Sequence, residues 1–167
     1  MGFQPARLRQ GEAIVGVAAV VLLVVLFALP WYGLTGGIGR AAATLGLPTS
    51  VNGYHGLTTL RWLILVTVVA GLALTYFQGS RSAPALPVSL SVIVTTLGVL
   101  TSLCLIYRVL ISLPGPDSLI EARAGAYVGL ACALAVAYGG YRSLRQEDQP
   151  DPQRNAAIPT VELESRR

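Results

Sequence analysis

Four long apolar segments, separated by polar or glycine-rich stretches, dominate this chain of 167 residues. A helix needs about 20 mainly apolar residues to cross roughly 30 Å of hydrocarbon. None of the four segments carries the polar stripe of period 3.6 that is typical of helices in a soluble bundle. The pattern predicts an all-α fold, an integral membrane four-helix bundle with spans at about 12–32, 57–77, 86–112 and 121–141.

Composition supports this class. Hydrophobic residues make up 53% of the chain and charged residues only 12%, with a mean hydropathy of +0.62. Soluble domains carry about twice that share of charge. The net charge of +4 comes from scattered arginines that form no patch, so we expect the lipid bilayer as a partner and no nucleic acid.

The first segment resembles a signal peptide at its start, because Arg7 and Arg9 precede an apolar run. The run is longer than an ordinary signal core, and it ends in Leu29-Pro30-Trp31-Tyr32 without a small-x-small cleavage site. We therefore expect a retained signal anchor.

Arginine distribution gives the orientation, since Arg and Lys near the span ends prefer the cytoplasmic side. With the N-terminus inside, the inner segments hold six arginines: Arg7, Arg9, Arg81, Arg142, Arg145 and Arg154. The outer segments hold four: Arg40, Arg61, Arg108 and Arg123. The bias predicts a multi-pass plasma-membrane protein with both termini in the cytoplasm (N-in/C-in).

The connecting segments differ in character. The first outer loop, residues 33–56, carries seven glycines in 24 residues, and within it 38–47 predicts a short interfacial helix that ends before Pro48. The chain divides into a transmembrane domain at 1–142 and a polar, proline-interrupted tail at 143–167. We expect that tail to be disordered, because it has too little apolar surface to offset its ordering entropy.

Small residues recur every fourth position in the last span, at Gly125, Gly129, Ala133 and Ala137. A second series runs through Ala131, Ala135 and Gly139. Such faces let helix backbones approach closely where lipid supplies no hydrophobic drive for association. The Gly125 series is the predicted helix-packing face. Two readings stay open: packing within the chain, and an interface with a second copy or a membrane protein partner.

Charged residues gather near the outer ends of the spans at Arg61, Arg108, Glu121 and Arg123. These four could form an outer-interface charge cluster that binds an anion or a lipid headgroup, or they could be anchors that snorkel to the interface. No Asp, Glu, Lys or His lies near the middle of a span, which argues against a proton-coupled transporter. Hydroxyls in the third span leave a path for a neutral solute open, although bonding to their own helix is the default.

Catalytic and metal-binding patterns are missing from the sequence. His55 is the single histidine and has no acidic partner in its loop, so it makes a poor metal or triad residue. Cys104 and Cys132 lie inside apolar runs with no metal spacing, and we read them as small hydrophobic residues. We expect no enzyme activity and no cofactor or metal.

Several segments resemble a family of small four-span membrane proteins from high-GC Gram-positive bacteria. The matching stretches are 29–33 (Leu-Pro-Trp-Tyr-Gly), 52–57, 86–98, 125–129 and 141–147. The resemblance implies a bacterial inner-membrane location and the four-span topology, but no activity. A likeness to claudin-type proteins is weaker, because the first outer loop has no cysteine pair. The sequence favours a structural or accessory protein that acts through helix packing and lipid or protein contacts. The alternative is a small transport component for a neutral or anionic solute.

Overall fold

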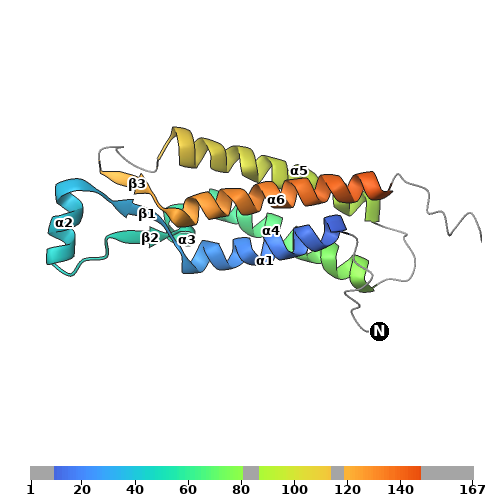
Figure 1. The fold of residues 1–167 in the computed structure, drawn as a ribbon, viewed down its shortest axis with the longest axis horizontal. Coiled ribbons are helices and arrows are strands. Elements are labelled where there is room, and N and C mark those ends of the chain that lie inside the picture. The colour runs from blue at the N-terminus through green and yellow to red at the C-terminus, as the bar shows by residue number, and fades with distance from the viewer. Residues whose placement is uncertain (1–9, 81–86, 114–118, 148–167) are drawn as a thin grey trace, which may run out of the picture.

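Four long helices lie side by side in a bundle (Figure 1). The computed structural model describes residues 10–80, 87–113 and 119–147. The long helices are α1 (Gln10–Ala28), α4 (Leu60–Ser80), α5 (Pro87–Ile106) and α6 (Ala124–Glu147). A π-helical turn, Tyr107–Ile111, continues α5. All four helices are long and apolar enough to cross a membrane, which agrees with the helical class and the four candidate spans of the sequence prediction.

The helices form a closed ring, because α1 packs on α4 and α6, and α5 packs on the same two helices. Side-chain hydrogen bonds connect each neighbouring pair. These bonds join Thr67 Oγ1 to Thr101 Oγ1 (2.7 Å, α4–α5), Thr75 Oγ1 to the Glu12 carbonyl (3.3 Å, α4–α1), Ser91 Oγ to Ser143 Oγ (3.4 Å, α5–α6) and Arg142 Nη2 to Gln10 Oε1 (2.7 Å, α6–α1). In membrane proteins such bonds contribute on average only about 0.6 kcal/mol each, a small amount, so we read these bonds as fixing register more than stabilising the bundle.

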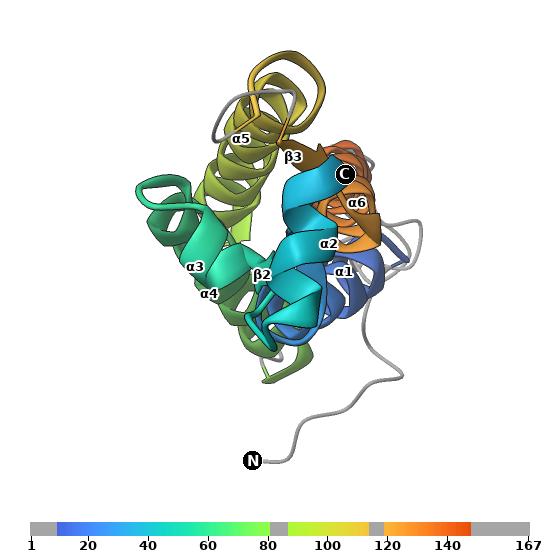
Figure 2. The ribbon, with the colours of Figure 1, turned by 90° about the vertical axis from the view of Figure 1, so that its left-hand side faces the viewer.

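One end of the bundle carries a small cap, which the sequence analysis did not predict. It consists of three strands and two short helices: β1 (Pro30–Leu34), α2 (Gly36–Thr44), β2 (Ser50–Asn52), α3 (Gly53–Gly56) and β3 (Ile120–Ala122). The strands form an antiparallel sheet in the order β2-β1-β3. Viewed onto this end, α2 lies across the front of the molecule (Figure 2).

Proline explains where α1 stops. Pro30 has no backbone N–H, and it disfavours helical geometry at the residue before it. The helix therefore ends at Ala28, and the chain continues as β1. The sequence prediction carried the first span through residue 32, which was wrong, because Pro30–Tyr32 belong to the sheet.

Three further boundaries differ from the sequence prediction. The second span was placed at 57–77, but α4 runs from Leu60 to Ser80. The fourth span was placed at 121–141, but Glu121 and Ala122 lie in β3, and α6 runs from Ala124 to Glu147. The predicted disordered tail therefore begins too early, since 143–147 are helical and Ser143 is fully buried. The rest of that tail lies outside the described residues. The short helix expected within 38–47 is confirmed as α2, which begins two residues earlier and ends before Pro48.

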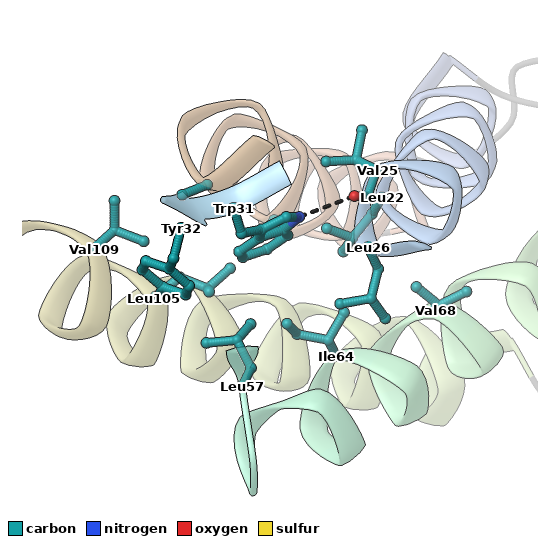
Figure 3. Packing of buried hydrophobic residues seen from close by; sticks show 12 residues of the cluster. Leu22, Val25, Leu26, Trp31, Tyr32, Leu57, Ile64, Val68, Leu105 and Val109 are labelled. Atoms are coloured by element: carbon teal, nitrogen blue, oxygen red, sulfur yellow. Dashed lines mark hydrogen bonds between the residues drawn. The ribbon is translucent and has the colours of Figure 1, made fainter. Parts of the chain in front are cut away.

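Trp31 lies at the centre of the larger hydrophobic cluster, where the cap meets the bundle (Figure 3). The register of β1 with β2 is irregular between Pro30 and Tyr32, so Trp31 occupies a bulge. A bulge breaks the alternation of a strand, and it lets two consecutive side chains, Trp31 and Tyr32, both be buried. Around them pack side chains from all four long helices, including Leu22, Leu26, Ile64, Val68, Leu105 and Ala133.

The two tryptophans provide a matched test of this core. Trp31 is 0% exposed, whereas Trp62 is 57% exposed. We expect Trp31→Ala to lower the free energy of unfolding by about 3–5 kcal/mol, because it opens a large cavity. Trp62→Ala should change it by less than about 1 kcal/mol. Thermal or chemical unfolding in detergent micelles measures both. Equal losses in the two variants would contradict the central role of Trp31.

Candidate functional site

The junction of cap and bundle is built around three glycines that surround the Trp31 indole. An ideal Cβ added at Gly53 would lie 2.6 Å from Trp31 Cε2, and one at Gly125 would lie 2.8 Å from Trp31 Cδ1. A Cβ at Gly129 would overlap the far edge of the same ring. No real side chain tolerates such contacts, so the indole fits because α3 and α6 carry glycine at these positions.

The polar edge of the indole is also satisfied. Trp31 Nε1 donates to the Val25 carbonyl in the last turn of α1 at 2.9 Å. The Trp31 carbonyl accepts from the Arg123 N–H at 2.8 Å, at the start of α6. One residue thus connects the end of α1, the sheet and the beginning of α6. This role of Trp31 was not predicted from the sequence, although Pro-Trp-Tyr directly after an apolar run is a signal for a chain that turns back onto its own helix.

The predicted packing face of α6 is filled from within the chain. Gly125 and Gly129 receive Trp31, and Ala133 is fully buried in the same cluster. Ala137 lies against Gly98 of α5, where an added Cβ would come within 2.8 Å of the Ala137 nitrogen. This geometry favours packing within the chain over an interface between copies at these four positions.

The second small series splits between two surroundings. Gly139 is buried against α1, where an added Cβ would lie 2.9 Å from the Gly11 carbonyl oxygen. Ala131 is exposed on the bundle surface, and Ala135 is half-buried. Ala131 therefore offers a matched surface control for the buried positions.

The four residues of the predicted charge cluster do not form one network. Glu121 and Arg123 are an ion pair at 3.5 Å, with both side chains partly exposed. The Arg123 guanidinium packs across Gly33 of β1. Arg108 donates to the Ser112 carbonyl at 3.3 Å on the π-helical turn. Arg61 lies on α4 with its guanidinium over two aromatic rings. The structure thus brings Glu121 and Arg123 together, while Arg61 and Arg108 have separate surroundings.

Asn52 ties the end of α1 to α3. Its Oδ1 accepts from the His55 backbone N–H at 3.2 Å and lies 2.8 Å from His55 Nδ1. Its Nδ2 donates to the Phe27 carbonyl at 3.1 Å. An open groove of about 390 Å³ lies beside these residues and is lined by 27–30, 50–52 and His55. No described residue combines with His55 into a group of three potential metal ligands.

Hydroxyls of α5 mostly bond within their own helix. Thr95 and Thr96 donate to the carbonyls of Ser91 and Val92, and Ser102 donates to Gly98 at 2.7 Å. Thr101 bonds across to Thr67 of α4. These hydroxyls are therefore engaged in helix and interhelix bonds, as the default interpretation expected.

The polar side chains described above mainly form hydrogen bonds within and between the helices and the cap. Cys104 and Cys132 are both free and half-buried. No family model, curated protein or solved structure matches this chain. The features that bear on function are the cap, its attachment to the bundle and the surfaces that both present.

Substitution at Gly129 tests whether α6 packs on Trp31. We expect Gly129→Leu to lower the free energy of unfolding by at least about 1–3 kcal/mol, because the new side chain displaces a buried indole. Ala131→Leu, on the exposed side of the same helix, should change it by less than about 0.5 kcal/mol. Unfolding in micelles measures both. A well-folded Gly129→Leu protein that loses only a chemical crosslink between copies would instead indicate a dimer interface.

Tyr32 gives a test based on pH. Its hydroxyl is buried without a hydrogen-bond partner, and burial raises the pKa of the phenol above 10.0, although the positive charge of Arg108 opposes this. Above pH 10 the unfolded chain loses the Tyr32 proton before the folded chain does, so this group's stabilisation falls as pH rises towards the folded pKa.

We expect Tyr32→Phe to abolish that part of the alkaline loss of stability. At pH 7 the same change should be neutral or slightly stabilising, because it removes an unpartnered buried hydroxyl. Unfolding curves at pH 7 to 11, with Tyr127→Phe on the exposed surface as the control, check both statements. Parallel pH profiles for wild type and Tyr32→Phe would contradict the prediction.

Proposed function

We propose that this chain is a multi-pass integral membrane protein with the bundle in the bilayer, the cap on the outer side and both termini in the cytoplasm. Large apolar side chains are exposed on the bundle, among them Val17, Val66, Val69 and Leu103. A patch of this extent is uncommon on a soluble monomer, and lipid chains would cover it. The arginine bias of the sequence supports the orientation.

Exposed aromatic residues support the depth of the bundle. At the cap end they are Phe27, Trp62, Tyr107 and Tyr127, and at the far end they are Tyr76, Phe77, Tyr138 and Tyr141. Two aromatic belts at opposite ends of a helical bundle are typical of the two interfaces of a membrane. Helices of 19 to 24 residues are about 28–36 Å long, which suits the hydrocarbon thickness.

We propose further that the protein is a non-enzymatic accessory subunit that presents its cap to another membrane protein. The observation that carries this proposal is the contrast between the two sides of the cap. Its inner side is fastened to the bundle through Trp31 and Asn52. Its outer side carries α2 and the following turn, where Ile38, Leu45 and Leu47 are each more than half exposed.

Apolar side chains in that position would face water beyond the lipid headgroups, and a partner surface would cover them. α2 packs on β1 and leaves these residues uncovered by the chain itself. The hydroxyls needed for the transport alternative are bonded to helix carbonyls or to each other, so they favour the accessory role.

Crosslinking in native membranes followed by affinity purification tests the proposal. We expect the wild-type chain to carry a stoichiometric membrane protein partner. Leu45→Ser combined with Leu47→Ser should reduce the recovered partner at least fivefold, because the contact area becomes polar. Val69→Ser, on the exposed face of α4, is the matched control and should leave the partner in place. Equal recovery with all three proteins would refute docking through α2.

A further inference from the structure

Arg61 lies in the first turn of α4, at the cap end of the bundle. Its guanidinium carbon is 4.9 Å from the centroid of the Tyr54 ring and 5.4 Å from that of Trp62. Its Nη1 also donates to the Tyr54 carbonyl at 3.4 Å. The contacts with two aromatic rings and one carbonyl oxygen fix the orientation of the Arg61 guanidinium. The N–H groups that do not take part in these contacts therefore point in a fixed direction.

The described part of the chain leaves this cation largely unsatisfied. The buried Nε of Arg61 has no hydrogen-bond partner. Glu121, which the sequence analysis grouped with Arg61, forms its ion pair with Arg123 instead. A guanidinium carries five N–H donors and keeps its charge at any pH that proteins experience. Because Nε is buried, an external oxoanion would bind at the Nη groups of this cation, which has no carboxylate partner among the described residues.

The surroundings indicate which oxoanion this is. Trp62 follows Arg61 in the chain and is among the exposed aromatic residues of the cap-end belt. Phe27, another member of that belt, stacks on Tyr54 with ring centroids 5.1 Å apart. Exposed Trp and aromatic side chains of this kind lie at the level of lipid headgroups. The oxoanion found at that depth is phosphate, which Arg binds through two parallel hydrogen bonds.

We propose that Arg61, in contact with the rings of Tyr54 and Trp62, binds the phosphate of an outer-leaflet phospholipid. This rests on the proposed function in placing the bundle in a bilayer with the cap end at the outer leaflet. The ligand chemistry is a phosphate ester, and a lipid headgroup is favoured over free phosphate because exposed Trp62 and Phe27 flank the site with apolar surface for the acyl chains.

Lipid binding to the purified full-length chain in detergent micelles tests the site. Dihexanoyl phosphatidylglycerol is titrated and bound lipid is counted by native mass spectrometry. Dihexanoylglycerol, which lacks the phosphate, and inorganic phosphate are run in parallel. We expect saturable binding of one phosphatidylglycerol per chain. Both comparison compounds should bind at least tenfold more weakly, because dihexanoylglycerol lacks the phosphate and inorganic phosphate lacks the acyl chains.

Three variants assign the binding to this residue. Arg61→Gln should weaken phosphatidylglycerol binding about tenfold or more, because it removes the charge. Arg61→Lys should fall between wild type and Arg61→Gln, because it keeps the charge but loses the two-pronged geometry. Arg40→Gln, an exposed arginine on α2, is the control and should bind like wild type. Arg61→Lys keeps the test decisive should Arg61→Gln fail to fold.

Equal binding by wild type and Arg61→Gln, equal binding by wild type and Arg61→Lys, or equal affinity for dihexanoylglycerol would overturn the proposal. Inorganic phosphate that binds as tightly as the lipid, and only when Arg61 is present, would overturn the lipid assignment in favour of a soluble phosphate ester. Failure here is separable from failure of the proposed function. Partner recovery depends on α2, and a topology reporter fused after residue 167 reads the orientation without reference to Arg61.

Discussion

The indole of Trp31, enclosed by glycines of the cap and of α6, is the contact on which the relation between cap and bundle depends. Glycine inside a helix costs about 1 kcal/mol relative to alanine, so Gly129 weakens α6 locally. Burial of a whole indole outweighs that cost. The indole N–H in addition bonds the Val25 carbonyl, near the point where Pro30 withholds a backbone donor from the end of α1. The Trp31 side chain therefore bonds the last turn of α1, which Pro30 ends, and packs against the glycines of α3 and α6.

Packing of small residues fixes the rest of the bundle in a similar way. Gly98 receives Ala137, Gly140 faces Thr95, and Gly139 faces Gly11 and Val15. Close backbone approach of this kind is how helices associate where lipid removes the hydrophobic drive. Hydrogen bonds between each neighbouring pair of helices add register, because a hydroxyl in an apolar bundle has few other partners.

The charged residues at the cap end acquire different roles from their positions around the ring. Glu121 and Arg123 neutralise each other beside β1, and Arg108 bonds the end of its own helix. Arg61 differs because its contacts are aromatic, and aromatic faces hold a cation without neutralising it. A guanidinium without a carboxylate partner among the described residues attracts anions more strongly than a paired one does. The surroundings of each guanidinium thus matter more than the number of arginines at that end.

Local information in the sequence was sufficient for the four long helices, the short helix before Pro48 and the small-residue face of α6. Helix hydrogen bonds join residues four apart, so a continuous apolar run or a glycine-alanine repeat already contains the signal. The sheet could not be predicted in this way, because β1 pairs with β3 about 90 residues further along the chain, and β2 and β3 have only three residues each. The same limit applied to the site. The sequence places Arg61 and Glu121 near one end of the bundle, but only the packing of the helices decides that Glu121 pairs with Arg123 while Arg61 rests on Tyr54. Contacts between distant segments depend on how the helices pack into a ring, and a local sequence pattern cannot predict that packing.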